Sequence, residues 1–269
     1  MKISNVFSRR NRILLRELVV TDFKLRYQGS VLGYAWSLLK PLFLFAIMYV
    51  VFGLLIRIGS VEHYPVYLLF GIVLWTFFSE ATNQGMASIV GRGDLLRKIS
   101  FPKYIVVLST TISALINLIL NLIIVAVLMV ISGVQVYSSI LLLPLYIIEI
   151  YILAIGLAFF LSTMYVKYRD VSHIWEIVMQ AAFYATPIIY PLSIVMAKSQ
   201  LVARFLMMNP LAQAIQDARY SLITHETITV ATLFKNEWYV TIPIAIVVIV
   251  FAGGSLYFKK NSKYFAENV

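Results

Sequence analysis

Residues 104 to 133, YIVVLSTTISALINLILNLIIVAVLMVISG, form a long run without a single charged side chain. A helix needs about 20 apolar residues to cross the hydrocarbon core of a bilayer, so this run is long enough to span a membrane. The whole chain has the same character, since 61% of its residues are hydrophobic, 13% are charged and its mean hydropathy is +0.88. This composition lies outside the soluble globular range and indicates an integral membrane protein.

Further apolar runs on both sides predict an all-α protein with six transmembrane helices. We expect the spans at 31–57, 66–90, 104–133, 139–166, 172–191 and 239–258. Pro187 and Pro191 interrupt the end of the fifth run, because proline cannot continue a helix. The predicted organisation is an N-terminal segment (1–30), a transmembrane domain (31–258) and a short tail (259–269).

The positions of the basic residues predict the orientation. Lys and Arg gather in the N-terminal segment, in the loop 91–103, in the turn after the fourth span and in the tail. Because such residues near span ends are retained in the cytoplasm, we expect both termini inside. The net charge of +10 fits this bias together with attraction to anionic membrane lipids, and we expect no nucleic-acid partner.

The N-terminal segment contains a predicted amphipathic helix, NRILLRELVVTDFKLRYQG, at 11–29. Its apolar side chains share one face: Leu14, Leu15, Leu18 and Val19. Arg16 and Glu17 point elsewhere, which predicts a helix lying at the membrane interface. Asp22 and Arg26, four residues apart, are placed to pair with each other. Simple membrane anchoring and contact with a partner protein both remain open.

Two further cytoplasmic elements are short. GRGDLLRKISFPK (91–103) predicts a small helix across the membrane face, and YVKYRDVSHIWE (165–176) predicts a tight turn between the fourth and fifth spans. Retention of positive charge explains Lys167 and Arg169 but leaves Asp170 unexplained. Asp170 either caps the fifth helix or contacts another protein.

The segment 192–238 precedes the last span and predicts a re-entrant hairpin. It is apolar and patterned, and Asn209-Pro210 divides it into two short helices. Each is too short to cross the bilayer, so we expect the pair to dip into its outer leaflet.

Polar residues within the spans are costly and need a purpose. Glu80 stands in a polar cluster with Asn83 and Gln84, suited to interhelical bonds or a hydrated path, and Glu149 lies within the fourth span. Helical spacing on the third span places three further polar residues on one face: Ser113, Asn117 and Asn121. These residues predict hydrogen bonds between helices.

Aromatic residues are frequent in the first and fifth spans. The candidates for a sugar-contacting route are Tyr34, Trp36, Phe43, Tyr49, Phe183 and Tyr184. Sugar rings present apolar C–H faces, so a row of aromatic rings suits the passage of a polymer. Interfacial belting and core packing explain the same residues, and both interpretations remain open.

The sequence lacks the residue patterns that metal binding, glycosyl transfer and ATP hydrolysis require. The chain has no Cys, and its three His are scattered, so we expect no metal site. No D-x-D sequence and no G-x-x-x-x-G-K-[ST] loop occur, so we expect neither glycosyl transfer nor ATP hydrolysis, and no cofactor bound by this chain.

Six ordered blocks of the sequence resemble a known family. They are LVVTDFKLRYQGSVLGYAWSLLKPL (18–42), GIVLWTFFSEA (71–81), LLRKISFPK (95–103), YVKYRDVSHIW (165–175), ATPIIYPLS (185–193) and NPLA (209–212). Across nearly the whole chain they are similar to ABC-2 type permease subunits that export bacterial cell-surface polysaccharides such as O-antigen, teichoic acid or capsule.

The resemblance implies a homodimeric permease in the bacterial cytoplasmic (inner) membrane. Two copies of a separate ATPase would bind ATP and Mg²⁺, and the substrate would be a lipid-linked polysaccharide of the cell envelope. Alternatives are an ABC-2 exporter of small hydrophobic molecules and, more remotely, a membrane glycosyltransferase.

The resemblance also implies roles for individual residues. The aromatic side chains of the first and fifth spans would line the substrate route. Two elements would contact the ATPase. In the loop 91–103 the contact residues would be Asp94, Arg97, Lys98, Phe101 and Pro102, and in the turn 165–176 they would be Arg169 and Asp170.

Overall fold

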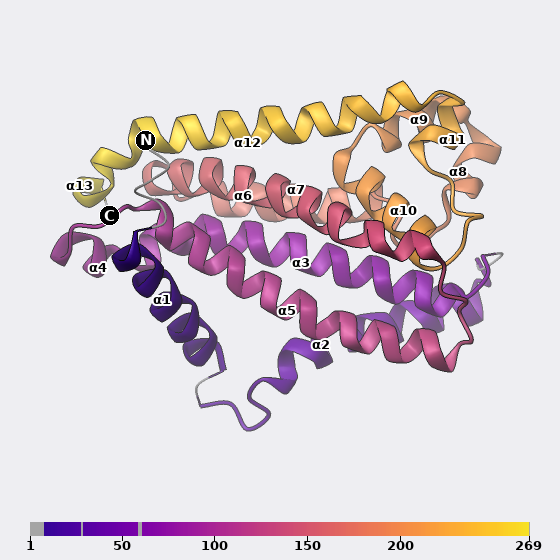
Figure 1. Ribbon diagram of the computed structural model, residues 1–269, viewed down its shortest axis with the longest axis horizontal. Helices are drawn as coiled ribbons and strands as arrows, with labels where there is room; N and C mark the ends of the chain where they lie inside the picture. The colour runs from indigo at the N-terminus through magenta and orange to yellow at the C-terminus, as the bar shows by residue number, and fades with distance from the viewer. Residues whose placement is uncertain (1–7, 28, 59–60, 269) are drawn as a thin grey trace.

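The chain folds into a single bundle of helices. The computed structural model describes residues 8–27, 29–58 and 61–268, and no strand occurs in these ranges. Long helices run side by side, and a group of short helices closes one end (Figure 1). The predicted all-α class is confirmed.

Six helices make up the body of the bundle. They are α2 (Ala35–Met48), continued by a π-helical stretch (Tyr49–Leu55), α3 (Tyr64–Gly91), α5 (Tyr104–Ile131), α6 (Leu143–Lys167), α7 (Val171–Ala185) and α12 (Thr241–Asn261). At one end lie α4 (Gly93–Lys98) and α13 (Phe265–Asn268) (Figure 1). The opposite end holds α8 (Leu192–Lys198), α9 (Gln200–Met207), α10 (Pro210–Leu222) and α11 (Val230–Phe234). We call these the α4 end and the α10 end. Short 3₁₀ turns occupy Ser138–Leu142, Glu237–Val240 and Ser262–Tyr264.

Five helical segments are long and apolar enough to cross a membrane. Within the described residues they are Ala35–Leu55, Tyr64–Gly91, Tyr104–Ile131, Ser138–Lys167 and Trp238–Tyr264. The predicted fifth span, 172–191, contains only the 15-residue helix α7. That helix is about 22 Å long at ~1.5 Å per residue, short of the ~30 Å core. Thr186 is extended, as favoured before Pro187, and ends it. The count of six spans is not confirmed.

Helix α3 forms the centre of the bundle. Most of its residues are buried, and it packs against α2, α5 and α6. Small residues allow close approach: Gly85 faces Ala158 of α6, and Gly254 of α12 lies against the backbone of Gly156. Such contacts are the usual means of joining helices in a membrane, where the hydrophobic effect does not drive their association.

The N-terminal helix α1 (Arg9–Tyr27) packs on α5 with the predicted face. Its inward residues are partly buried: Leu14, Leu15, Leu18 and Val19. Arg16 and Glu17 are exposed, so the helix and its predicted apolar face are confirmed, and its position at the membrane interface stays a prediction.

The segment 192–238 divides at Asn209-Pro210 as predicted, but it holds four short helices and not two. Asn209 Oδ1 accepts from the Leu211 amide at 3.0 Å, and Pro210 occupies the first turn of α10. Ser199 starts α9 in the same way by accepting from the Val202 amide. Its side chain therefore separates α8 from α9 within what the sequence presents as one helix. The re-entrant placement stays a prediction.

Candidate substrate groove and coupling surface

A polar groove lies between α2 and α3. Its volume is about 390 Å³, and it is lined by Trp36, Ser37, Lys40, Ser79, Glu80, Asn83 and Gln84. The groove thus unites two predicted site residues, Trp36 and Glu80, that the sequence analysis treated separately. Lys40 was missed, although its place four residues after Trp36 within a predicted span was a usable signal.

The groove combines the groups that bind phosphorylated sugars. The Trp36 side chain is exposed and offers a ring face to sugar C–H groups. The exposed Lys40 ammonium suits phosphate, and Glu80 with the two amides suits sugar hydroxyls. Asn117 of α5 donates to Glu80 Oε2 at 3.1 Å, which fixes the carboxylate toward the groove wall.

The predicted aromatic residues lie in two separate groups. On the first span, the rings of Tyr34, Trp36 and Phe43 are exposed, whereas Tyr49 stacks on Phe45 with centroids 5.7 Å apart. On α7, Phe183 packs edge-on against Trp75 of α3, and Tyr184 is exposed. Within one chain both groups lie on elements that pack against α3.

Helix α7 also carries an exposed polar stripe that sequence reasoning missed. His173, Glu176, Gln180 and Tyr184 are all exposed and follow one another at helical spacing. Exposed apolar residues accompany the stripe, including Ile174 and Ile177, and Met179 is the buried residue of this helix. The spacing i, i+3, i+7, i+11 was visible in the sequence, but exposure of that face was not.

The loop 91–103 forms a small anchored platform at the α4 end. Leu96 is buried in a cluster with Ile89 and Phe265, whereas Asp94, Arg97 and Lys98 are exposed. The other two predicted contact residues, Phe101 and Pro102, are only partly exposed: Phe101 packs against the same cluster and Pro102 lines an adjoining cleft. The short helix predicted here is confirmed.

The turn between α6 and α7 lies at the same end (Figure 1). Arg169 and Asp170 are exposed, and the Arg169 guanidinium lies 5.3 Å from the ring centroid of Tyr165. Asp170 occupies the N-cap position of α7, but its side chain accepts no capping hydrogen bond. Capping by Asp170, one of the two interpretations of the sequence, is therefore wrong.

A partly buried ion pair joins α1 to this platform. Arg92, directly before α4, pairs with Asp22 of α1 and donates to Ser109 Oγ of α5 at 2.8 Å. Ser109 in turn donates to Asp22 Oδ2 at 3.2 Å. The partner predicted for Asp22 was Arg26, whose side chain lies outside the described residues.

Of the three polar residues on α5 that were predicted to join helices, two do so. Asn117 bonds Glu80 of α3, and Asn121 donates to the Ser37 carbonyl of α2 at 3.2 Å. Ser113 instead bonds the Ser109 carbonyl of its own helix. Glu149 is far from Glu80 in this arrangement, since it lines a different pocket at the α10 end.

Comparison with known proteins places the fold in a family. The model of the ABC-2 type transporter family matches residues 13–223. An O-antigen export system permease protein RfbA of Myxococcus xanthus is 28% identical over 260 residues, covering 96% of each chain. A protein of the same name from Klebsiella pneumoniae is 27% identical and covers 94% of each chain. The chain belongs to the ABC-2 type transporter family.

Proposed function

We propose that this chain is the permease subunit of an ABC exporter that carries a lipid-linked polysaccharide across the bacterial cytoplasmic membrane. The observation that carries the proposal is its similarity to O-antigen export permeases over almost the full length of both chains. The α2–α3 groove supports it, because Trp36, Lys40 and Glu80 offer contacts to a sugar ring, a phosphate and hydroxyl groups.

The polar stripe on α7 supports a homodimer. The proposal places α7 in the membrane, where ionisable and amide side chains face a protein partner or a water-filled path, because lipid cannot bond them. Glu176 and Gln180 have exposed side chains on the surface of a single chain. A second copy facing α7 would shelter this stripe and bring the exposed rings of the first span and α7 toward one path.

The α4 platform suits docking of the ATPase subunits that drive export. An ATPase outside the membrane acts on the spans only through rigid elements that it touches. Buried Leu96 anchors α4, and the Asp22–Arg92 pair connects it to α1, so a push on Arg97 and Lys98 reaches several helices together.

Co-purification of the chain with its ATPase, followed by mass spectrometry of bound glycolipid, tests the proposed substrate. We expect a lipid-linked polysaccharide in the complex and up to about tenfold less of it in Trp36→Ala, since an aromatic stacking contact contributes about 0.5–1.5 kcal/mol. Trp238→Ala is the matched control, because Trp238 is exposed away from the groove. Retention of small hydrophobic molecules without any glycolipid would contradict the proposal.

Cysteine cross-linking tests the homodimer. The chain contains no Cys, so single replacements report cleanly. Gln180→Cys should form a disulfide between copies in native membranes, whereas Val248→Cys, exposed on α12, should not. Equal cross-linking at both positions, or none at 180, would reject α7 as the dimer surface.

A further inference from the structure

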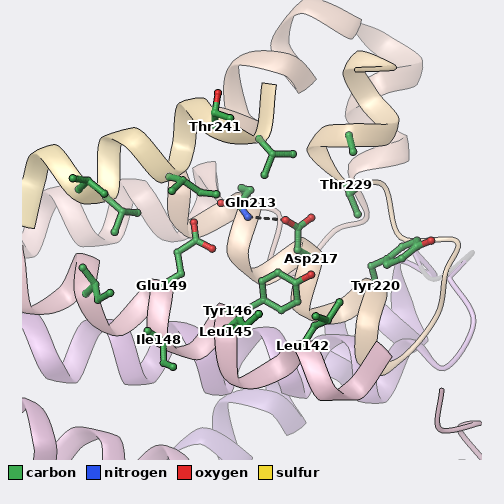
Figure 2. Close-up of a pocket in the computed structure, with 16 residues that line it drawn as sticks. Leu142, Leu145, Tyr146, Ile148, Glu149, Gln213, Asp217, Tyr220, Thr229 and Thr241 are labelled. Atoms are coloured by element: carbon green, nitrogen blue, oxygen red, sulfur yellow. Dashed lines mark hydrogen bonds between the residues drawn. The ribbon is translucent and has the colours of Figure 1, made fainter. Parts of the chain in front are cut away.

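A second, larger pocket lies near the α10 end and is lined mainly by residues of α6, α10 and α12. Its volume is about 950 Å³. Figure 2 shows Glu149 from α6 and both Gln213 and Asp217 from α10 turned toward one another at its polar part. No role was assigned to this pocket by the family comparison or by the proposed export route, whose groove lies between α2 and α3.

The mouth of the pocket is apolar and exposed. Leu145 and Ile148 of α6 and Ile244 and Val248 of α12 are among its lining residues, and each is between 45% and 60% exposed. Both helices belong to segments that are apolar enough to span a membrane. The mouth therefore presents an acyl-chain surface to the bilayer.

The polar part of the pocket is built from buried groups. Gln213 is 1% exposed and Asp217 is 8% exposed. Gln213 Nε2 donates to Asp217 Oδ2 at 2.6 Å. This bond uses one of the two amide N–H groups and fixes the orientation of the Gln213 side chain, so that its oxygen remains available to a ligand.

Two acceptor atoms in this part of the pocket receive no donor of normal geometry. Gln213 Oε1 and Glu149 Oε1 are both buried, and neither accepts a hydrogen bond from the described residues, although the two side chains lie within interaction range of each other. A buried acceptor without a donor costs about 1–3 kcal/mol, and more for a charged group. None of the described lining residues is Lys or Arg, so the wall offers two carboxyl groups without a cationic side chain beside them.

We propose that this pocket binds a phospholipid with a primary-ammonium headgroup, such as phosphatidylethanolamine. The ammonium brings three N–H donors and one positive charge to a site with unpartnered oxygens and two carboxyl groups. The acyl chains lie along the apolar mouth between α6 and α12. A phosphatidylcholine headgroup has the charge but no N–H donor, and an anionic headgroup has the wrong charge.

Native mass spectrometry of the full-length purified chain tests this site. The delipidated protein is exchanged with equal amounts of phosphatidylethanolamine, phosphatidylcholine and phosphatidylglycerol that carry identical acyl chains. We expect phosphatidylethanolamine to be retained about tenfold over phosphatidylcholine, the factor given by loss of one charge-assisted hydrogen bond. Equal retention of the three lipids would overturn the proposal.

Variants locate the preference. Glu149→Gln and Asp217→Asn keep the side-chain shape, remove an acidic group and should abolish the preference. Glu226→Gln is the matched control, since Glu226 is exposed near the α10 end and does not line the pocket. An undiminished preference in the two pocket variants would reject the site.

A separate variant tests the site even if the two pocket variants fail to fold. Val248→Phe adds apolar volume at the exposed mouth without touching the polar groups and should reduce retention of all three lipids. Unchanged retention would contradict binding at this mouth. Because every readout is lipid binding by the chain alone, failure of the proposed export function would leave these results unaffected.

Discussion

Arg219 attaches the α10 end to the body of the bundle. It is fully buried and donates to three backbone carbonyls: Tyr67 at 2.9 Å, Pro187 at 2.6 Å and Ile188 at 2.8 Å. Its guanidinium also lies 3.5 Å from the centroid of the Tyr67 ring. The planar fork of arginine suits several acceptors at once, so lysine would not replace it. One side chain thereby joins α10, α3 and the segment after α7.

Gly71→Ala tests this attachment. The added Cβ would collide with Nη2 of Arg219, so we expect the free energy of unfolding to fall by about 1–3 kcal/mol. Gly253→Ala is the matched control, because no heavy atom from outside its own helix backbone lies within 4 Å of the added Cβ. Thermal unfolding in detergent compares the two, and equal stability of Gly71→Ala and wild type would contradict the attachment.

The sequence predicted the interhelical hydrogen bonds of Asn117 and Asn121 but not those of Arg219. Asn117 and Asn121 lie at regular spacing within an apolar run, so bonding to other helices was their evident purpose. Arg219 stands in the segment for which the sequence predicts a re-entrant hairpin, and its acceptors are carbonyls up to 152 residues away. Every residue carries a backbone carbonyl, so the sequence does not indicate which carbonyls accept a hydrogen bond. The contacts of Arg219 could therefore not be predicted.

Among the elements, α4 carries the proposed link to ATP hydrolysis. A double charge reversal, Arg97→Glu with Lys98→Glu, changes only exposed side chains and leaves the anchor Leu96 in place. We expect the permease to fold normally and its affinity for the ATPase to fall about tenfold or more, by reversal of interface charges. Titration of the purified subunits measures this affinity.

Lys198→Glu with Lys235→Glu is the matched control for the α4 variant. Both lysines are exposed near the α10 end, so the change in net charge is equal but distant from α4. Normal ATPase binding by the α4 variant, or an equal loss in the control, would exclude a docking role for α4.

Element by element, the sequence predicted the amphipathic α1, the short α4 and the helix start at Pro210. These depend on local signals such as apolar periodicity, glycine and proline. The length of the fifth span was not predicted correctly from local signals. The sequence predicted 172–191, but Thr186 and Pro187 end α7 after 15 residues. The sequence analysis named two residues of the groove, Trp36 and Glu80. It did not name Lys40, because only the packing of α2 on α3 brings Lys40 beside them.

At the scale of the whole molecule, the two ends of the bundle should face opposite sides of the membrane. His63, Tyr137 and His225 lie in segments near the α10 end, and Lys98, Arg169 and Lys263 near the α4 end. The Lys/Arg bias predicts that the α4 end is cytoplasmic. Cysteines introduced at the first three positions should react with an impermeant maleimide added to intact cells, and those at the other three should not. External labelling at position 98 would reverse the predicted orientation.

ATP-driven movement of polymer tests the account most directly. The purified chain and its ATPase are reconstituted in vesicles that contain a lipid-linked polysaccharide, and exposure of the polymer to a glycosidase on the far side is followed. We predict ATP-dependent exposure that requires both subunits and is lost with the α4 charge reversal. Exposure without ATP, or ATP-dependent pumping of a small hydrophobic dye while the polysaccharide stays in place, would contradict the account.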